Sequence, residues 1–161
     1  MSEGRRLSLA LTGIAASLLA STAGASVTTS YPGTECVQEM PLGQHLVYSG
    51  SRASNQSTGT VFIACPAVQQ GGVILSAKVS GRDITTTGSV SCNAATSDRF
   101  DTSGSFGATV SSGAAFGGSF TLNLPVPPAF FTNGSKVIHC SLPPGDPMAG
   151  SSIGSYIITE N

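Results

Sequence analysis

The chain has 161 residues, of which only 9% are charged, and its formal net charge is −1 at pH 7. Charge this sparse provides no basic stripe to neutralise phosphates, which argues against nucleic acid as a partner. Ser, Thr, Asn and Gly must supply the polar surface instead, a composition common on secreted β proteins.

The first 25 residues have the three parts of a secretory signal peptide. Arg5 and Arg6 form the positive segment, the apolar run 7–20 follows, and Ala23-Gly24-Ala25 is a small-x-small cleavage site. The run is shorter than the ~20 residues of a membrane span, and a retained N-terminal anchor is the alternative. We therefore expect residues 1–25 to be removed, leaving 26–161 as a single secreted or periplasmic domain without a membrane span.

Short runs of β-branched and apolar residues recur along this domain between turn residues, as in sandwiches and barrels. The clearest run, 120–124, alternates apolar and polar residues, so one face should be buried and the other wet. In the run 73–79 we expect one buried face to be formed by Val73, Leu75, Ala77 and Val79. Further strands are expected at 46–49, 60–65, 89–93, 106–111, 136–142 and 155–159.

Turn residues separate these runs. Asn133-Gly134 predicts a type I′ turn with positive φ at both positions, joining a short strand near Phe130-Phe131 to the strand that begins at Lys136. The Gly-, Ser- and Ala-rich segment 103–119 predicts a loose hairpin or a long surface loop. The fold class predicted is all-β: an antiparallel β-sandwich of about eight strands, jelly-roll or immunoglobulin-like but without the immunoglobulin tryptophan, since the chain has no Trp.

Four cysteines follow the expected cleavage site, and an even number in an exported chain predicts disulfides with three possible connectivities. Cys65, Cys92 and Cys140 share strand parity with apolar neighbours, so they should point inward and clamp either two sheets or two neighbouring strands. The preferred pairs are Cys36–Cys65 and Cys92–Cys140, which the loop-entropy model values at roughly 3.5 and 4 kcal/mol. Metal ligation by cysteine is not expected, because no C-x-x-C is present.

Two carboxylates could offer oxygen ligands to calcium. Asp98 and Asp101 flank Arg99 in a turn-rich segment, but calcium takes about six to eight oxygens. We interpret the segment as a structural loop and Asp83 likewise as structural. Glycoside hydrolysis needs two carboxylates facing across a cleft, whereas Glu35 and Glu39 are interpreted as solvated surface.

Nucleophilic catalysis has one candidate motif. Gly150-Ser151-Ser152-Ile153-Gly154 matches G-x-S-x-G, which functions at a turn between a strand and a helix. Here a Pro- and Gly-rich segment precedes the motif and only 155–161 follow, so we interpret it as a loop entering the last strand. His45 and His139 are the only histidines, and a surface or cross-strand role is expected for both.

Several short motifs occur in a fixed order: Tyr31-Pro32-Gly33-Thr34-Glu35-Cys36, then Asn55, Cys65-Pro66, Val90-Ser91-Cys92, His139-Cys140 and the ending 155–160. This order resembles a group of small secreted bacterial proteins of uncharacterised function, with a YPG-x-x-C start and four cysteines. The resemblance implies an exported, disulfide-bonded β-sandwich and no site residues.

The leading hypothesis is a non-enzymatic secreted module with a structural or interaction-mediating role and an extracellular partner. The second is a lectin-like module that binds a surface glycan. It is weakened because sugar-binding faces often use Trp or Tyr, and this chain has no Trp and 3 Tyr. The third is a small secreted hydrolase. No catalytic, cofactor-binding or metal-binding residue is assigned, and no cofactor is expected.

Overall fold

The computed structural model describes residues 25–40, 45–68, 72–86, 88–100, 102–113, 118–129, 131, 134–145 and 150–161. Residues 1–24, which carry most of the expected signal peptide, lie outside this range, as do Asp101, Phe130 and Asn133. Within it the regular elements are strands and one short 3₁₀ turn. They are β1 (Val27–Pro32), η1 (Gly33–Glu35), β2 (Val37–Met40), β3 (Leu46–Ser49), β4 (Arg52–Asn55), β5 (Val61–Pro66), β6 (Ile74–Asp83), β7 (Ser91–Ser97), β8 (Gly104–Phe106), β9 (Val110–Ser111), β10 (Gly118–Leu124), β11 (Ser135–Leu142) and β12 (Ser152–Glu160).

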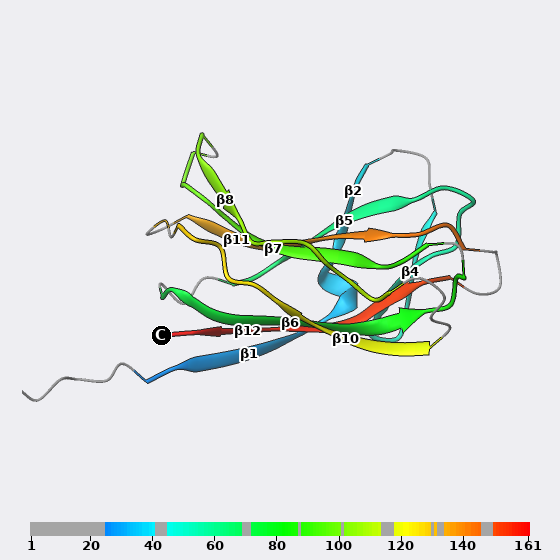
Figure 1. The fold of residues 1–161 in the computed structure, drawn as a ribbon, viewed down its shortest axis with the longest axis horizontal. Coiled ribbons are helices and arrows are strands. Elements are labelled where there is room, and N and C mark those ends of the chain that lie inside the picture. Colours follow the sequence, from blue (N-terminus) through cyan, green and yellow to red (C-terminus); the bar gives the residue numbers. More distant parts are fainter. Residues whose placement is uncertain are drawn as a thin grey trace, which may run out of the picture.

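The strands form two sheets in which every pair is antiparallel, which confirms the predicted sandwich (Figure 1). Sheet A has the order β10-β6-β12-β4-β3, with β1 also paired to β12. Sheet B has the order β2-β5-β11-β7-β8, with β9 also paired to β7. The sequence predicts about eight strands, whereas the described residues form 12, because β1, β2 and β4 lacked a clear pattern and 106–111 divides into two strands.

The core lies between the sheets and is made by alternate residues of each strand, since successive side chains point to opposite faces. The prediction for 120–124 is confirmed, with Leu122 and Leu124 buried and Thr121 and Asn123 exposed. The core includes Val61, Ile63, Val79, Val90, Ile138, Leu142, Ile153, Tyr156 and Ile158. Tyr31 stacks on Tyr156 there, with ring centroids 4.9 Å apart.

The prediction for the start of β6 is wrong. Ile74 is 4% exposed, whereas Val73 and Leu75 are 43% and 47% exposed. The register between β6 and β12 shifts between Thr159, which pairs with Ser76, and Glu160, which pairs with Ile74. Leu75 is therefore an extra residue in β6. Such a bulge reverses side-chain parity. Counting alternate residues back from Ala77 therefore assigned Leu75 and Val73 to the buried face, although both are exposed.

Two turn predictions are also wrong. Phe131 is in no strand, and β11 pairs with β5 and β7, so among the described residues no hairpin joins a strand at Phe131 to β11. A side chain at Gly134 would collide with the carbonyl oxygen of Ser97, 1.8 Å from the ideal Cβ position. The segment 103–119 is not a single loop either, because β8 and β9 within it both pair with β7.

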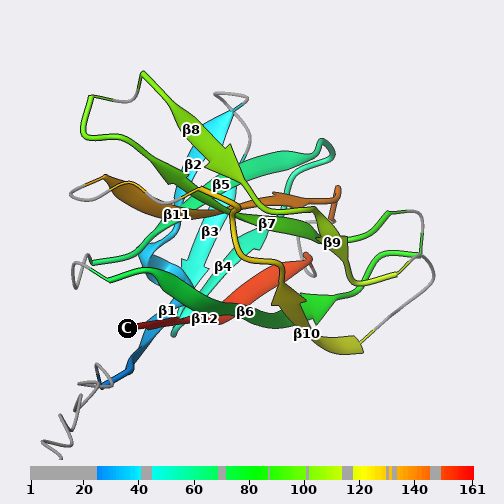
Figure 2. The ribbon, with the colours of Figure 1, turned by 60° about the vertical axis from the view of Figure 1, so that its left-hand side comes forward.

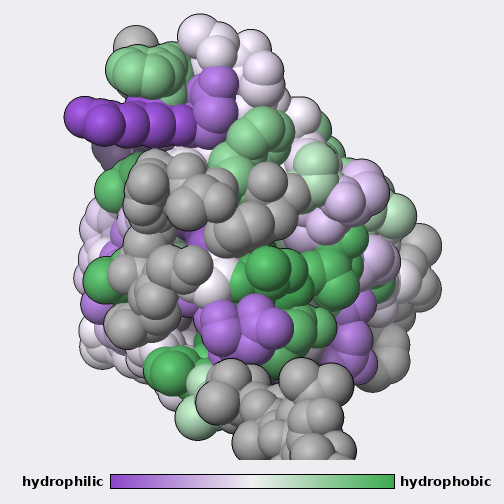
Figure 3. Space-filling view, turned by 90° about the vertical axis from the view of Figure 1, so that its left-hand side faces the viewer, coloured by the Kyte–Doolittle hydropathy of each residue, from purple (hydrophilic) through white to green (hydrophobic). Residues whose placement is uncertain are grey.

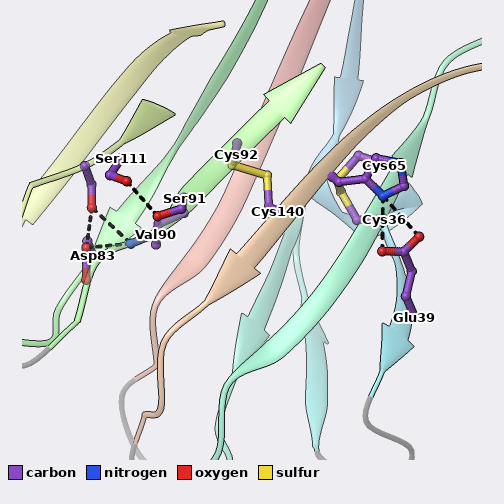
Figure 4. The surroundings of a disulfide bond; sticks show 11 residues. Cys36, Glu39, Cys65, Asp83, Val90, Ser91, Cys92, Ser111 and Cys140 are labelled. Carbon is purple, nitrogen blue, oxygen red and sulfur yellow. Dashed lines mark hydrogen bonds and ion pairs between the residues drawn. A yellow bond between two sulfur atoms is a disulfide. The ribbon is translucent and has the colours of Figure 1, made fainter. Parts of the chain in front are cut away.

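Both disulfides have the preferred pairing, Cys36–Cys65 and Cys92–Cys140. All four cysteines are buried, as strand parity predicts for Cys65, Cys92 and Cys140. Each bridge joins neighbouring strands of sheet B, since Cys92 lies opposite Cys140 and Cys36 precedes the β2 residue that pairs with Ala64 (Figure 4). The bridges therefore fasten strands within one sheet and do not span the two sheets.

Polar side chains make the connections between the sheets. Asn55 of β4 is fully buried and donates from Nδ2 to the carbonyl oxygens of Leu142 and Pro143, at 3.0 and 2.8 Å. Lys136 of β11 forms a buried ion pair with Glu160 of β12, with 2.8 Å between Nζ and Oε1. Each connection places a paired group in the interior, where an unpaired one would be costly.

Two bridges and the absence of free cysteine fit an oxidising compartment outside the cytoplasm. Across the residues that the structure describes, no helix has the length and apolar character that crossing a membrane requires.

Candidate functional site

The outer face of sheet B carries a concavity of about 750 Å³. Its lining comes from β2, β5, β11, β7 and β8 and from four residues between β7 and β8, namely Asp98, Arg99, Thr102 and Ser103. In Figure 1, β8 and β2 rise from the upper sheet on either side of the central strands, and Figure 2 shows β8 standing away from that sheet. Its lining includes Glu39, His139, Phe106, Asp98, Arg99 and Thr102.

Strand register brings these residues together from distant parts of the chain. His139 lies between Ala64 of β5 and Asn93 of β7. Two residues further along β7 from Asn93, Ala95 lies opposite Phe106 of β8. Odd-numbered residues of β11 face outward because Ile138, Cys140 and Leu142 are in the core. This register fixes His139 on the outer face, opposite to Cys140, as its position next to that cysteine predicts.

A polar pair forms one wall of the concavity. The Nδ1 atom of His139 lies 3.1 Å from Oε1 of Glu39, and both side chains are partly exposed. Glu39 belongs to β2, where the register with β5 shifts between Gln38 and Met40. A bulge of this kind re-aims a side chain, and here the Glu39 side chain meets the outer face. Figure 4 shows Glu39 beyond Cys36 on this strand.

Aromatic side chains form the opposite wall and rim. Phe106 is 61% exposed, and its ring centroid lies 6.2 Å from that of His139 at an interplanar angle of 46°. On the rim, the Arg99 guanidinium lies 5.6 Å from the centroid of the Phe100 ring, within the range of a cation–π contact. Figure 3 shows a hydrophilic projection beside a hydrophobic one at the top of this end of the molecule.

Asp98 organises the rim loop. Its carboxylate accepts hydrogen bonds from the backbone N–H groups of Phe100 and Thr102, at 3.2 and 2.7 Å, and from the Thr102 hydroxyl. The Thr102 hydroxyl is the strongest of several donors that hold the pKa of Asp98 below its ordinary value. Asp98 therefore stays ionised and holds its own turn, which agrees with its interpretation as a structural loop residue; Asp101 lies outside the described residues.

Asp83 has a structural role, as the sequence predicts. It is fully buried and accepts hydrogen bonds from the Val90 N–H at 3.0 Å, from the Ser151 hydroxyl at 3.0 Å and from Ser112. Burial acts to raise the pKa of Asp83, but these donors and Thr85 together hold it below the ordinary value. Asp83 thus ties the ends of β6 and β9 to the segment that enters β12.

The G-x-S-x-G motif enters a strand. Ser152 is the first residue of β12 and is 3% exposed. The strand continues to Glu160, so no helix follows the serine. This placement confirms the interpretation as a loop entering the last strand. Glu35 and His45 are exposed and do not line the concavity.

Sequence reasoning missed most of this site. It placed Glu39 on solvated surface and assigned no role to Phe106 or to the exposed side of β7. One signal was available, because Phe106 is a large apolar residue within a Gly- and Ser-rich segment. The proximity of Phe106, Glu39 and His139 depends on sheet order, which local patterns do not encode.

No family model and no curated protein matches the sequence. Among solved structures, the chain is similar to a GH26-CBM35 β-(1,4)-mannanase from Podospora anserina, with a TM-score of 0.49 and 10% identity over 83% of this chain and 28% of that one. It is also similar to an exo-β-1,3-galactanase from Phanerochaete chrysosporium bound to galactose, with a TM-score of 0.42 and 15% identity over 82% of this chain and 29% of that one. The chain therefore spans less than a third of either protein. Likeness at this level bears on neither activity nor ligand.

Proposed function

We propose that the protein is a secreted, non-catalytic module that binds a glycan in the concavity on the outer face of sheet B. The observation that carries this proposal is the meeting of an exposed aromatic ring, Phe106, with the polar pair Glu39 and His139 in one concave surface. The volume of about 750 Å³ falls within the roughly 300–1,000 Å³ of small-molecule sites.

The chemistry of a sugar matches this arrangement. A sugar ring has C–H groups on its faces and hydroxyl groups around its edge. The exposed Phe106 ring offers apolar area to a face, while Glu39 and His139 offer an acceptor and a ring nitrogen to the edge. The absence of Trp had weakened the lectin-like hypothesis, and Phe106 provides an exposed aromatic surface in place of a Trp.

Two features support a non-catalytic role. A glycosidase needs two carboxyl groups that face each other across a cleft. Of the two glutamates that the sequence raised, only Glu39 lines the concavity, and the Asp98 carboxylate accepts hydrogen bonds from its own turn. A serine hydrolase of the G-x-S-x-G type needs its nucleophile at a strand–helix turn, whereas Ser152 begins β12 and is followed by strand up to Glu160. These observations favour binding over hydrolysis at the sites that the sequence raised.

A glycan array probed with the purified mature protein, with and without calcium, tests the proposal. For any glycan that binds, Phe106→Ala should weaken the affinity about tenfold or more, the equivalent of about 1.4 kcal/mol. Phe62→Ala is the matched control, because Phe62 is 47% exposed on sheet B but does not line the concavity. Binding to no glycan, or equal losses in the two variants, would refute the proposal.

A structural or interaction-mediating role without a glycan is the second candidate. Val37 and Phe62 are 53% and 47% exposed on neighbouring strands β2 and β5, and exposed apolar side chains in proximity are typical of protein contacts. A silent array together with capture of one defined partner that Phe62→Ala abolishes would support this role over glycan binding.

A further inference from the structure

We propose that the outer face of sheet A binds an oxyanion between Arg52 and Arg82. The ligand class is a sulfate, phosphate or carboxylate group, either as a free ion or as the charged group of an acidic polysaccharide. This site lies on the other sheet from the concavity of sheet B, so the inference does not depend on the proposed glycan site.

Strand register places a row of polar residues across three strands of sheet A. Ser152 of β12 pairs with Arg82 of β6 on one side and with Ser54 of β4 on the other. Arg52 lies two residues before Ser54, on the same face of β4. These residues line one hollow of about 200 Å³, together with Gln56, Ile84 and Gly150.

Among the residues that the structure describes, no acidic side chain lines this hollow. Within the part of the chain that the structure describes, neither Arg52 nor Arg82 makes a hydrogen bond or an ion pair. Asp83 is adjacent to Arg82 in sequence but is fully buried, and hydrogen bonds from the core side occupy its carboxylate. Two guanidinium groups that share a hollow repel each other, and an anion between them removes that repulsion.

The donors in the hollow match an oxyanion. Each guanidinium presents a planar fork of N–H groups that binds carboxylate or phosphate oxygens in pairs. The Ser54 and Ser152 hydroxyls make no side-chain hydrogen bond among the described residues and offer two further donors. Ser152 is 3% exposed and fixed between two strands, so one donor is already held in position.

NMR titration of the ¹⁵N-labelled mature protein tests this inference, with sodium sulfate, inorganic phosphate and a sulfated oligosaccharide added separately at constant ionic strength. We expect saturable shifts at the Arg52 and Arg82 side-chain N–H groups and at the Ser54 and Ser152 amides. Arg52→Ala and Arg82→Ala should each weaken binding about tenfold or more, since each removes a charge-assisted pair of hydrogen bonds. Both arginines are exposed, so the variants should fold normally.

One control removes a positive charge elsewhere on the same face. Lys78→Ala changes an exposed cation of β6 that does not line the hollow. This variant should bind the anion within about twofold of the wild type. Equal weakening in all three variants, or no saturable shift with any of the three anions, would overturn the inference. Saturation by sulfate and phosphate alone identifies a free ion as the ligand, whereas tighter binding of the oligosaccharide identifies an acidic polysaccharide; either result supports the site.

Discussion

Replacing the buried Asn55 tests how the two sheets are held together. Its Nδ2 group donates to the carbonyl oxygens of Leu142 and Pro143, at 3.0 and 2.8 Å, and Oδ1 accepts from the Ser57 N–H at 2.9 Å. Asn55→Ala leaves two buried carbonyl oxygens without this donor. At about 1–3 kcal/mol for each orphaned buried group, the free energy of unfolding should fall by about 2–6 kcal/mol, a large part of the ~5–15 kcal/mol that stabilises a domain.

The charge-sensitive variant Asn55→Asp sharpens this test. It keeps an acceptor for Ser57 but replaces the donor with an oxygen that faces the carbonyl oxygens of Leu142 and Pro143. Burial and this contact disfavour the carboxylate, so the pKa of the new acid is raised in the folded state. The variant should therefore be least stable at neutral pH and should regain stability as the pH falls, because protonation restores a donor.

Chemical denaturation with the disulfides intact measures both variants. Asn123→Ala is the matched control, since Asn123 is exposed on β10, and it should change the free energy of unfolding by no more than about 0.5 kcal/mol. If Asn55→Ala were as mild as Asn123→Ala, or if Asn55→Asp lost stability toward low pH relative to the wild type, the role assigned to Asn55 would be wrong.

Three further outcomes test other parts of the structure. The donors to Asp83 lower its pKa on folding. The stabilisation that Asp83 provides is therefore complete above the unfolded pKa of about 3.9 and is lost as the pH falls through the folded pKa. Asp83→Asn should reduce the loss of stability at acidic pH, and an unchanged loss would contradict this role. Removing the Cys92–Cys140 bridge with two Ala substitutions should lower the free energy of unfolding by up to about 4 kcal/mol. Non-reducing peptide mapping checks the disulfide connectivity, and other pairs would refute it. Burial raises the pKa of Tyr156 far above its ordinary value, so in a spectrophotometric titration Tyr156 should stay un-ionised until the protein unfolds. Complete ionisation of the tyrosines in the folded protein would be inconsistent with this burial.

Local sequence patterns predicted the elements where strands are regular. Parity placed Cys65, Cys92 and Cys140 in the interior, and alternation identified the buried face of 120–124. The same reasoning failed at Leu75, where a bulge opposite the end of β12 reverses the faces. A bulge depends on the partner strand, which is distant in sequence, so alternation within β6 alone gives no sign of it.

Spacing along the chain also gives little sign of the roles of individual residues. Asn55 is fully buried and its Nδ2 group is hydrogen-bonded to the carbonyl oxygens of Gly59, Leu142 and Pro143, so it is a structural link between the sheets. Gly134 suggested a turn with positive φ, but it is needed because the Ser97 carbonyl oxygen occupies the space of a side chain. Both roles arise from segments that meet only in the folded protein.

The sequence by itself determined that the protein is an all-β sandwich with inward-pointing cysteines, because a period of two and residue polarity are local properties. Only the tertiary structure decided which strands are neighbours, and this order brings Glu39, Phe106 and His139 onto one face and Arg52 and Arg82 onto the other sheet. Strand order is set by the packing of the whole core, in which residues far apart in the chain contribute together. The two candidate binding surfaces are consequences of that packing.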